Sequence, residues 1–355
     1  MKRHWYAILF SAVLLCFTTY IALDTFVLGR AYQGGATEMN LALFRETQQT
    51  AAPQAAPETI AAPTAETTET LTTAEPAEAA GSTEPPAQSQ TEAAASEAEE
   101  PETGFLPVDA GDGTVIGTYT DDNMQVTLVQ YERYDTVVYA ADVQLTSAEY
   151  LKTAFAQDTY GKNITQKTSE IAAAHGAILA VNGDYYGTQE SGYVIRNGVI
   201  YRDSAKRGTD VLCVYADGTM EVVSGEEKTA QELLESGVWQ AFSFGPALLQ
   251  TGEIAVSETE EVGKAMASNP RTAIGMIAPL HYVLVVSDGR TEESQGLSLY
   301  QLAEFMQSLG ITTAYNLDGG GSSTMVFEGE LVNKPTSGGS SIKERSVSDI
   351  VYIGY

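Results

Sequence analysis

Residues 316–325, Asn-Leu-Asp-Gly-Gly-Gly-Ser-Ser-Thr-Met, combine residue types that suit an anion. An apolar run ends at Asp318, and three glycines then precede three hydroxyl residues. Glycine tolerates positive φ and has no Cβ, so the N–H groups of Gly319, Gly320 and Gly321 can crowd against an oxyanion. The Gly-Lys-Ser/Thr ending of a P-loop is missing. The stretch predicts either a carboxylate beside an oxyanion or phosphate site, or a sharp turn between two strands.

Two other aspartates also follow apolar runs. Asp184 comes after residues 177–181, and Asp288 comes after residues 281–286. Proteins place reactive groups at strand ends and in loops, although Asp-Gly and Gly-Asp pairs also form ordinary turns. Together with Asp318, three carboxylates at three strand ends indicate a site more than three unrelated turns.

Two arginines could bind an anion in such a site. Arg271 enters an apolar run, where a cation needs a partner, and Arg345 comes just before the last predicted strand. A guanidinium group binds phosphate or carboxylate through two parallel hydrogen bonds. The alternative is a structural salt bridge to one of the aspartates.

Other chemistries have weaker sequence support. The three histidines lack metal-ligand spacing, and no cysteine pair could bind zinc. Ser322 and Ser323 lack the Gly-x-Ser-x-Gly context of a nucleophilic serine. A divalent cation held by Asp288 or Asp318 stays open as a cofactor, without a ligand spacing that supports it.

Strands outnumber helices in the hydrophobic pattern, and hairpins dominate. Helices are expected at residues 168–175, 229–236 and 298–309. Strands are expected at residues 124–130, 136–145, 177–181, 193–195, 199–201, 211–215, 219–223, 239–249 with a break at Gly245-Pro246, 271–277, 281–286, 311–317, 324–327 and 349–353. The fold class is therefore α+β, a mixed β-sheet core with flanking helices, and not a doubly wound fold.

The N-terminal segment has the composition of a membrane anchor. Lys2 and Arg3 precede residues 5–23, which are uncharged, largely apolar and long enough to cross a hydrocarbon core of ~30 Å. Residues 24–28 lack the small residues of a signal-peptide cleavage site, which favours an uncleaved signal anchor. The positive residues put the N-terminus in the cytoplasm and the rest of the chain outside.

An acidic, low-complexity segment follows. Residues 38–102 carry thirteen Glu and one Arg among Ala, Thr, Pro and Gln. Such a segment cannot bury enough surface to offset its ordering entropy, which predicts a disordered tether that holds a domain away from the membrane. We expect a membrane anchor at 1–30, the tether at 31–104 and one folded domain at 105–355.

Charge and cysteine content limit the setting. The formal net charge of −28 argues against nucleic acid as a partner. Cys16 lies in the predicted membrane span and Cys213 does not, so no disulfide framework can form. These features indicate a single-pass protein of a bacterial, Gram-positive cell membrane with an extracellular folded domain.

Five segments, taken together and in this order, resemble the phosphodiester glycosidase family. They are residues 180–186, 269–275, 288–290, 316–325 and 344–347. The blocks Arg-Thr-Ala-Ile-Gly and Asn-Leu-Asp-Gly-Gly-Gly-Ser-Ser are specific as a pair, and the resemblance extends over residues 130–355. It implies an extracellular hydrolase that cleaves the sugar C1–O bond of a sugar-1-phosphodiester, such as an N-acetylglucosamine-1-phosphodiester.

The resemblance also implies roles for the candidate residues. A phosphate monoester leaves with little protonation, so Arg271 and Arg345 would neutralise it in place of a strong general acid. Positive charge builds on the sugar ring, so Asp318 would act near C1 as nucleophile or base. Asp288 and Glu344 would be a second carboxylate or orient an arginine. The expected substrate-binding residues are Asn182, Asp184, Asn316, Gly319, Gly320, Gly321, Ser322 and Arg290.

The expected substrate is a sugar-phosphate glycan, a surface glycan or exopolysaccharide outside the membrane. Two alternatives stay open: a non-catalytic module that binds cell-wall or capsule glycans, and a phosphodiesterase that cleaves the P–O bond. The product separates them, because only C–O cleavage releases free reducing sugar, whereas P–O cleavage releases sugar-1-phosphate.

Overall fold

The computed structural model describes residues 5–32, 39, 104–259, 268–337 and 341–355. Nearly all of the predicted tether, residues 31–104, lies outside these described residues. Helix α1 spans Trp5–Phe26, slightly longer than the 5–23 predicted from sequence. Within it, Ile8–Thr25 has a mean hydropathy of 1.8. By length and composition, α1 can cross a membrane.

The chain contacts the folded domain shortly after α1. Strand β1 (Arg30–Ala31) pairs antiparallel with β6 (Gly161–Lys162). The Tyr32 N–H also donates to the Tyr160 carbonyl at 2.8 Å. Three residues therefore separate the end of α1 from the first residue that pairs with the domain.

An eight-stranded sheet with the order β15-β14-β18-β16-β17-β4-β3-β2 forms the largest layer. Its strands are β2 (Thr114–Thr120), β3 (Met124–Arg133), β4 (Thr136–Leu145), β14 (Ala247–Gln250), β15 (Glu253–Ile254), β16 (Arg271–Ala278), β17 (His281–Ser287) and β18 (Thr313–Asn316). Apolar residues on both faces of this sheet are buried, so it needs a covering layer on each side.

Two five-stranded sheets cover one of these faces. The first has the order β20-β19-β8-β24-β5 and the second the order β10-β9-β13-β11-β12. The first contains β5 (Leu151–Phe155), β8 (Leu179–Asn182), β19 (Met325–Phe327), β20 (Glu330–Leu331) and β24 (Asp349–Ile353). The second contains β9 (Val194–Arg196), β10 (Val199–Arg202), β11 (Asp210–Tyr215), β12 (Met220–Ser224) and β13 (Val238–Phe242). Short antiparallel pairs join β7 (Gln166–Lys167) to β23 (Ser346–Val347) and β21 (Thr336–Ser337) to β22 (Ser341–Ile342).

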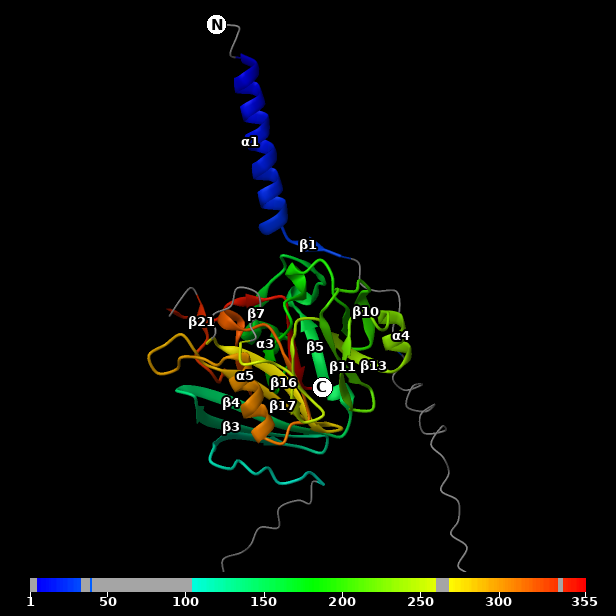
Figure 1. The fold of residues 1–355 in the computed structure, drawn as a ribbon, viewed down its shortest axis with the longest axis vertical. Coiled ribbons are helices and arrows are strands. Elements are labelled where there is room, and N and C mark those ends of the chain that lie inside the picture. Colours follow the sequence, from blue (N-terminus) through cyan, green and yellow to red (C-terminus); the bar gives the residue numbers. More distant parts are fainter. Residues whose placement is uncertain (1–4, 33–38, 40–103, 260–267, 338–340) are drawn as a thin grey trace, which may run out of the picture. The chain divides into compact units, whose positions relative to one another are not determined.

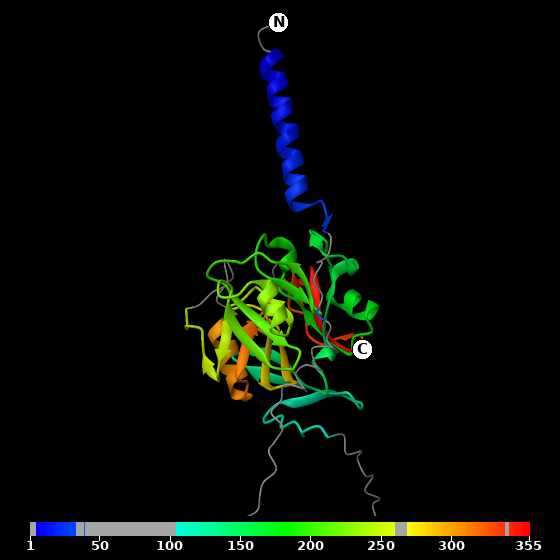
Figure 2. The same cartoon turned by 90° about the vertical axis from the view of Figure 1, so that its right-hand side faces the viewer.

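The helices lie on the outside of these sheets (Figure 1). Helix α5 (Leu299–Ser308) covers the other face of the eight-stranded sheet, where Leu302 and Phe305 are buried. Helix α3 (Thr168–Ala174) covers the first five-stranded sheet, and α4 (Ala230–Glu235) covers the second. Figure 2 shows α5, in orange, and the green helical segment near residue 170 on opposite sides of the strands.

The sequence predicted the class and most elements. The α+β class with few helices is confirmed, and residues 136–145 form β4 with the predicted bounds. The sequence predicted a mixed sheet, whereas every strand pair within the described residues is antiparallel. The run at 239–249 forms two strands in different sheets, β13 and β14, because the Gly245-Pro246 segment interrupts it. Strands β2 and β5 were not predicted, since their sequences alternate weakly.

Truncation of one leucine in the central strand tests this layer arrangement. Leu284 on β17 is fully buried between the sheets. We expect Leu284→Ala to lower the free energy of unfolding by about 2–5 kcal/mol, because it leaves a cavity in a packed core. The matched control is Leu331→Ala, whose side chain is 46% exposed and should change stability by less than about 0.5 kcal/mol. Equal effects in urea unfolding would contradict the assigned core.

Candidate functional site

One cavity of about 700 Å³ contains most of the predicted site residues. Its lining residues are Tyr185, Phe244, Asn269, Arg271, Arg290, Asn316, Asp318, Gly319, Gly320, Gly321 and Arg345. They come from loops and strand ends of all three large sheets. Five predicted residues do not line it: Asn182, Asp184, Asp288, Ser322 and Glu344.

The Gly-rich loop lies where two sheets meet. It leaves β18 of the eight-stranded sheet, forms the short helix η4 (Gly320–Ser322) and enters β19 of a five-stranded sheet. The Asn182 side chain fixes this crossing. Its Nδ2 donates to the Asp318 carbonyl at 2.6 Å, and its Oδ1 accepts from Thr272 Oγ1 at 2.8 Å and from Thr324 N–H at 3.2 Å. Asn182 is completely buried and contacts protein atoms through both ends of its amide.

Asp318, Ser322 and Arg345 form a polar cluster at the cavity. Ser322 Oγ and Arg345 Nη2 both donate to Asp318 Oδ2, the latter at 2.9 Å, and Arg345 Nη2 also contacts Ser322 Oγ. The Asp318 side chain is 12% exposed and that of Arg345 is 42% exposed. Burial raises the pKa of Asp318, whereas Arg345 and Ser322 oppose the rise. The arginine thus favours the ionised carboxylate, while burial makes that carboxylate a stronger base than an exposed aspartate.

The glycines allow a close approach of backbone and side chains. Gly320 has a φ of 62°, and a Cβ there would lie 2.8 Å from Arg290 Nη2. Its N–H donates to the Pro270 carbonyl at 2.8 Å, so this group serves the loop itself. A Cβ at Gly319 would lie 3.0 Å from the same carbonyl. Residues with a side chain would therefore push the loop away from Arg290 and Pro270.

Two further arginines line the cavity beside these glycines. Arg271 is buried, and its Nε donates to the Leu297 carbonyl at 2.9 Å. Arg290 Nε and Nη2 donate to Asn269 Oδ1 at 3.2 and 2.8 Å. Arg290 also has a φ of 61°, in the left-handed region that costs energy for any residue with a side chain. Three guanidinium groups and one carboxylate thus share this cavity among its described lining residues.

Asn316 lines the cavity, and its side-chain oxygen is a potential hydrogen-bond acceptor for a ligand. Its Nδ2 donates to the Gly245 carbonyl at 2.8 Å. Its Oδ1 is buried and has no hydrogen-bond partner within the part of the chain that the structure describes. A buried unpaired acceptor costs free energy, so a ligand donor that reached this oxygen would gain a favourable site.

Asp184 lies behind the cavity in a buried ion cluster. Arg196 Nη2 donates to Asp184 Oδ1 at 2.8 Å and to Asp349 Oδ2 at 2.9 Å. All three residues are almost completely buried. Burial raises the pKa of Asp349 to about 7, with Arg196 opposing the rise and Asp184 adding to it. One guanidinium therefore serves two carboxylates, and the second is only partly compensated.

Two other predicted carboxylates bind protein groups outside the cavity. Asp288 Oδ1 accepts from the Lys334 N–H at 2.8 Å and from Asn333 Nδ2 at 3.4 Å, and burial raises the pKa of Asp288. Glu344 accepts from the N–H and the Oγ of Ser169, at 2.8 and 2.7 Å, in the first turn of α3. These contacts hold a loop and a helix end in place.

The sequence did not single out Tyr185, Phe244 or Asn269 as site residues. Tyr185 follows the Gly-Asp pair after β8, and that position beside a predicted site loop was the available signal. Phe244 gave no signal, because an aromatic residue inside a predicted strand suggests core. Arg196 also gave none, since its partners Asp184 and Asp349 are distant in sequence.

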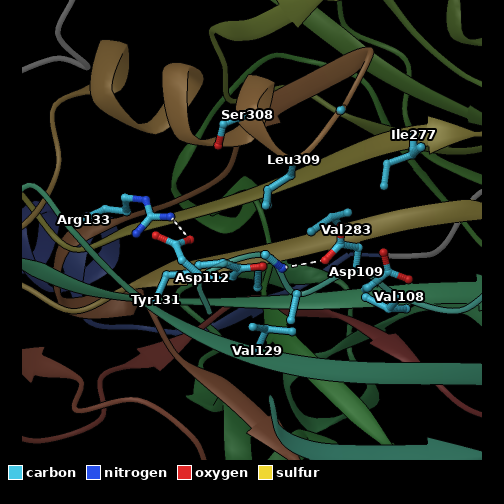
Figure 3. Close-up of a pocket in the computed structure, with 15 residues that line it drawn as sticks. Val108, Asp109, Asp112, Val129, Tyr131, Arg133, Ile277, Val283, Ser308 and Leu309 are labelled. Atoms are coloured by element: carbon cyan, nitrogen blue, oxygen red, sulfur yellow. Dashed lines mark hydrogen bonds and ion pairs between the residues drawn. The ribbon is translucent and has the colours of Figure 1, made fainter. Parts of the chain in front are cut away.

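A second cavity, of about 580 Å³, lies between residues 108–112, the strands of the eight-stranded sheet and the end of α5 (Figure 3). Arg133 forms an ion pair with Asp112 there, and Asp109 Oδ1 accepts from the Gly111 N–H at 2.9 Å. None of the predicted site residues lines it. We therefore assign the candidate site to the cavity at the Gly-rich loop.

The described residues also show whether side chains could bind a metal ion together. Among them, no group of three or more His, Cys, Asp or Glu side chains is arranged to hold a metal ion. Asp288 and Asp318, the two carboxylates suggested for a divalent cation, face different surroundings: Asp288 binds the loop at 333–334, and Asp318 binds Arg345 and Ser322.

We expect Asp349→Asn to change how stability depends on pH. The folded-state pKa of about 7 lies above the ordinary value of about 3.9. The wild-type carboxyl therefore favours the folded state most below pH ~4, and this contribution is lost as the pH rises through about 7. The free energy of unfolding of the variant, relative to wild type, should rise by roughly 2–4 kcal/mol between pH ~4 and ~8. Urea unfolding measures it, and a difference that does not vary with pH would contradict this titration.

Known proteins resemble this chain in sequence and in fold. The chain is 29% identical over 196 residues to the SPbeta prophage-derived uncharacterized protein YomE of Bacillus subtilis, covering 54% of this chain and 29% of that protein. It is 30% identical over 183 residues to N-acetylglucosamine-1-phosphodiester alpha-N-acetylglucosaminidase of Mus musculus, covering 47% of this chain and 35% of that protein. The chain thus spans about a third of the length of these curated relatives.

The catalytic domain of the zebrafish N-acetylglucosamine-1-phosphodiester alpha-N-acetylglucosaminidase has a similar fold, with a TM-score of 0.52 and 21% identity. The match covers 69% of this chain and 88% of that one. The model of the phosphodiester glycosidase family matches residues 175–354, which include the whole Gly-rich loop and all the residues that line the cavity. Since that match takes in half of the 355 residues, the chain belongs to the phosphodiester glycosidase family.

Proposed function

We propose that this chain hydrolyses the sugar C1–O bond of a sugar-1-phosphodiester that resembles an N-acetylglucosamine-1-phosphodiester. The observation that carries this proposal is the single cavity in which Asp318, paired with Arg345 and Ser322, lies beside a Gly-rich loop and two further arginines. Family membership supports the reaction class, and the name of the mouse relative supports the sugar.

The arginines account for departure of the phosphate. Arg290 packs against Gly320 and Arg271 lies near Gly319, so both guanidinium groups border the same loop. A phosphate monoester is already a good leaving group, and positive groups fixed before the reaction stabilise the charge that develops on it. Because the leaving group is neutralised in this way, the reaction needs no strong general acid.

Asp318 supplies the negative charge near the sugar. Positive charge develops at C1 and the ring oxygen in the transition state, and a carboxylate stabilises it. Asp318 is the one carboxylate among the described residues that line the cavity. It either attacks C1 to form a glycosyl-enzyme or takes the proton of the attacking water. Ser322 and Arg345 fix its orientation from one side.

The substrate's setting follows from the N-terminal helix. An α1 that spans a membrane would place the folded domain outside the cell, because Lys2 and Arg3 precede it. A surface glycan or exopolysaccharide with sugar-phosphate links, at a bacterial and Gram-positive membrane, is the substrate class that we propose.

The bond that breaks can be identified with labelled water. The full-length protein in detergent is incubated with an α-N-acetylglucosamine-1-phosphodiester in ¹⁸O water, and the products are analysed by mass spectrometry. We expect label in the free sugar and none in the phosphate. Asp318→Asn should lower kcat by ~10³-fold, since the remaining side chain carries no charge to stabilise the transition state. The matched control, Asp109→Asn in the second cavity, should keep wild-type rates.

Label in the phosphate would replace this proposal with P–O cleavage. Binding without product in the wild-type protein would favour the glycan-binding module. Wild-type turnover by a correctly folded Asp318→Asn variant would remove Asp318 from the chemistry.

Arg271→Lys tests the phosphate contact. A lysine keeps the charge but loses the planar pair of donors and the bond from Nε to Leu297. We expect KM for the phosphodiester to rise by about tenfold, with a smaller change in kcat. Arg207→Lys is the control, because that side chain is 91% exposed and pairs with Glu226. Unchanged kinetics in Arg271→Lys would show that Arg271 holds only the loop.

A further inference from the structure

Two aromatic side chains line the cavity beside the charged groups. Tyr185 and Phe244 are half-buried, and they are the aromatic residues among the described lining. We propose that the Tyr185 ring, with Phe244, forms a sugar platform that selects the pyranose ring of the substrate. This inference rests on the proposed function and assigns the determinant of sugar specificity.

Tyr185 is held in a conformation that it would not adopt freely. Its φ of 62° and ψ of 31° lie in the left-handed region, which disfavours a residue with a bulky side chain. Such strain persists only where neighbouring contacts fix the backbone, and it concentrates at functional sites. A glycine would fit this turn without strain, so the tyrosine side chain needs another explanation.

The contacts around Tyr185 supply the restraint. On one side, Asp184 is fixed by Arg196. On the other, Tyr186 is buried and stacks on Tyr160 with ring centroids 5.1 Å apart. The Tyr186 N–H also donates to Asp184 Oδ1 at 3.2 Å. Both residues that flank Tyr185 are therefore held by contacts within the protein, and Tyr185 itself lines the cavity.

The same carboxylate also positions Phe244. Asp184 Oδ2 accepts from the N–H of Ser243, the preceding residue, at 3.0 Å. The Phe244 N–H donates to Tyr315 Oη at 3.0 Å. Asp184 thus precedes one of the two aromatic residues in the chain and binds Ser243, the residue that precedes the other. The backbone that carries Tyr185 and Phe244 is therefore fixed by hydrogen bonds, and we infer that both aromatic rings serve the cavity.

The chemistry of a sugar suits this arrangement. A pyranose ring has apolar C–H faces that stack on aromatic rings, and polar groups around its edge. The Arg345 guanidinium carbon lies over the Tyr185 ring, 5.7 Å from the ring centroid, so the opposite face of the ring is the one available to a sugar, and Arg345 binds Asp318. A sugar on Tyr185 would therefore bring C1 to the Asp318 side of the cavity. Arg271 and Arg290, beside Gly319 and Gly320, would take the phosphate.

Tyr185 could instead act only by holding Arg345, and the two roles make different predictions. A sugar contact affects ligands that contain the sugar, whereas loss of Arg345 orientation affects phosphate binding and kcat. Inorganic phosphate and free N-acetylglucosamine, used separately as competitive inhibitors of the full-length protein, distinguish them.

We expect Tyr185→Gly to raise KM for the phosphodiester, and Ki for N-acetylglucosamine, by about tenfold. Its kcat and its Ki for phosphate should stay within about twofold of wild type, and Tyr185→Phe should resemble wild type because the ring remains. The matched control is Tyr134→Gly, since Tyr134 also has positive φ, at 52°, but lies outside the cavity.

Three outcomes would overturn the platform. The first is an unchanged Ki for N-acetylglucosamine in Tyr185→Gly. If the wild-type protein still cleaves the C–O bond, this result contradicts the platform but not the proposed function. The second is a fall in kcat together with weaker phosphate inhibition, which assigns Tyr185 to Arg345. The third is a wild-type protein that neither cleaves the diester nor is occupied by either inhibitor, and this would remove the proposed function as well.

Discussion

A single guanidinium group, buried with two carboxylates, connects the parts of the molecule that build the cavity. Arg196 lies on β9, Asp349 on β24 and Asp184 in the loop after β8, so the cluster joins the two five-stranded sheets. Arg196 also contacts the Ala241 carbonyl and lies over the Phe242 ring at 4.4 Å. Taking these groups out of water is costly, and the attraction and hydrogen bonds among them offset part of that cost only while their geometry is kept. Any change that separates these groups leaves an uncompensated charge in the core, so the sheets keep one relative position.

The buried ion cluster is connected to the cavity through neighbouring residues in the chain. Asp184 precedes Tyr185 in the chain, and its second oxygen holds Ser243, next to Phe244. On the opposite side, Asn182 fixes the carbonyl of Asp318 and the strand that carries Arg271. The cavity is therefore built from strand ends and from loops that these contacts hold in place. The three arginines give the cavity a positive lining in a chain with a net charge of −28, and the proposed anionic substrate would need this local positive charge, because the acidic surface elsewhere would repel it.

The sequence predicted strand positions better than strand partners. Alternation and hairpin turns located β4, β9 and β10, since those signals are local. It could not show that β13 and β14 join different sheets, because that depends on packing between distant segments. Residue type also failed to separate ligand groups from structural ones. Asn182 and Glu344 carry the same polar atoms as a binding residue, yet those atoms contact Asp318, Thr272 and Ser169 of the protein itself. Asp318 and Arg345 were both predicted as site residues. Their hydrogen bond joins residues 27 apart in the sequence, and only the structure shows it.

The pairing of β1 with β6 fixes a short connection between α1 and the folded domain. Residues 27–29 separate α1 from β1, and three residues span at most about 11 Å. The chain contacts the folded domain again at Met39, whose N–H donates to the Gly198 carbonyl, and at Leu106, whose N–H donates to Gln144 Oε1. With α1 in a bilayer, this short connection would keep the cavity close to the lipid surface, so a substrate held near that surface would reach the cavity more readily than a distant one.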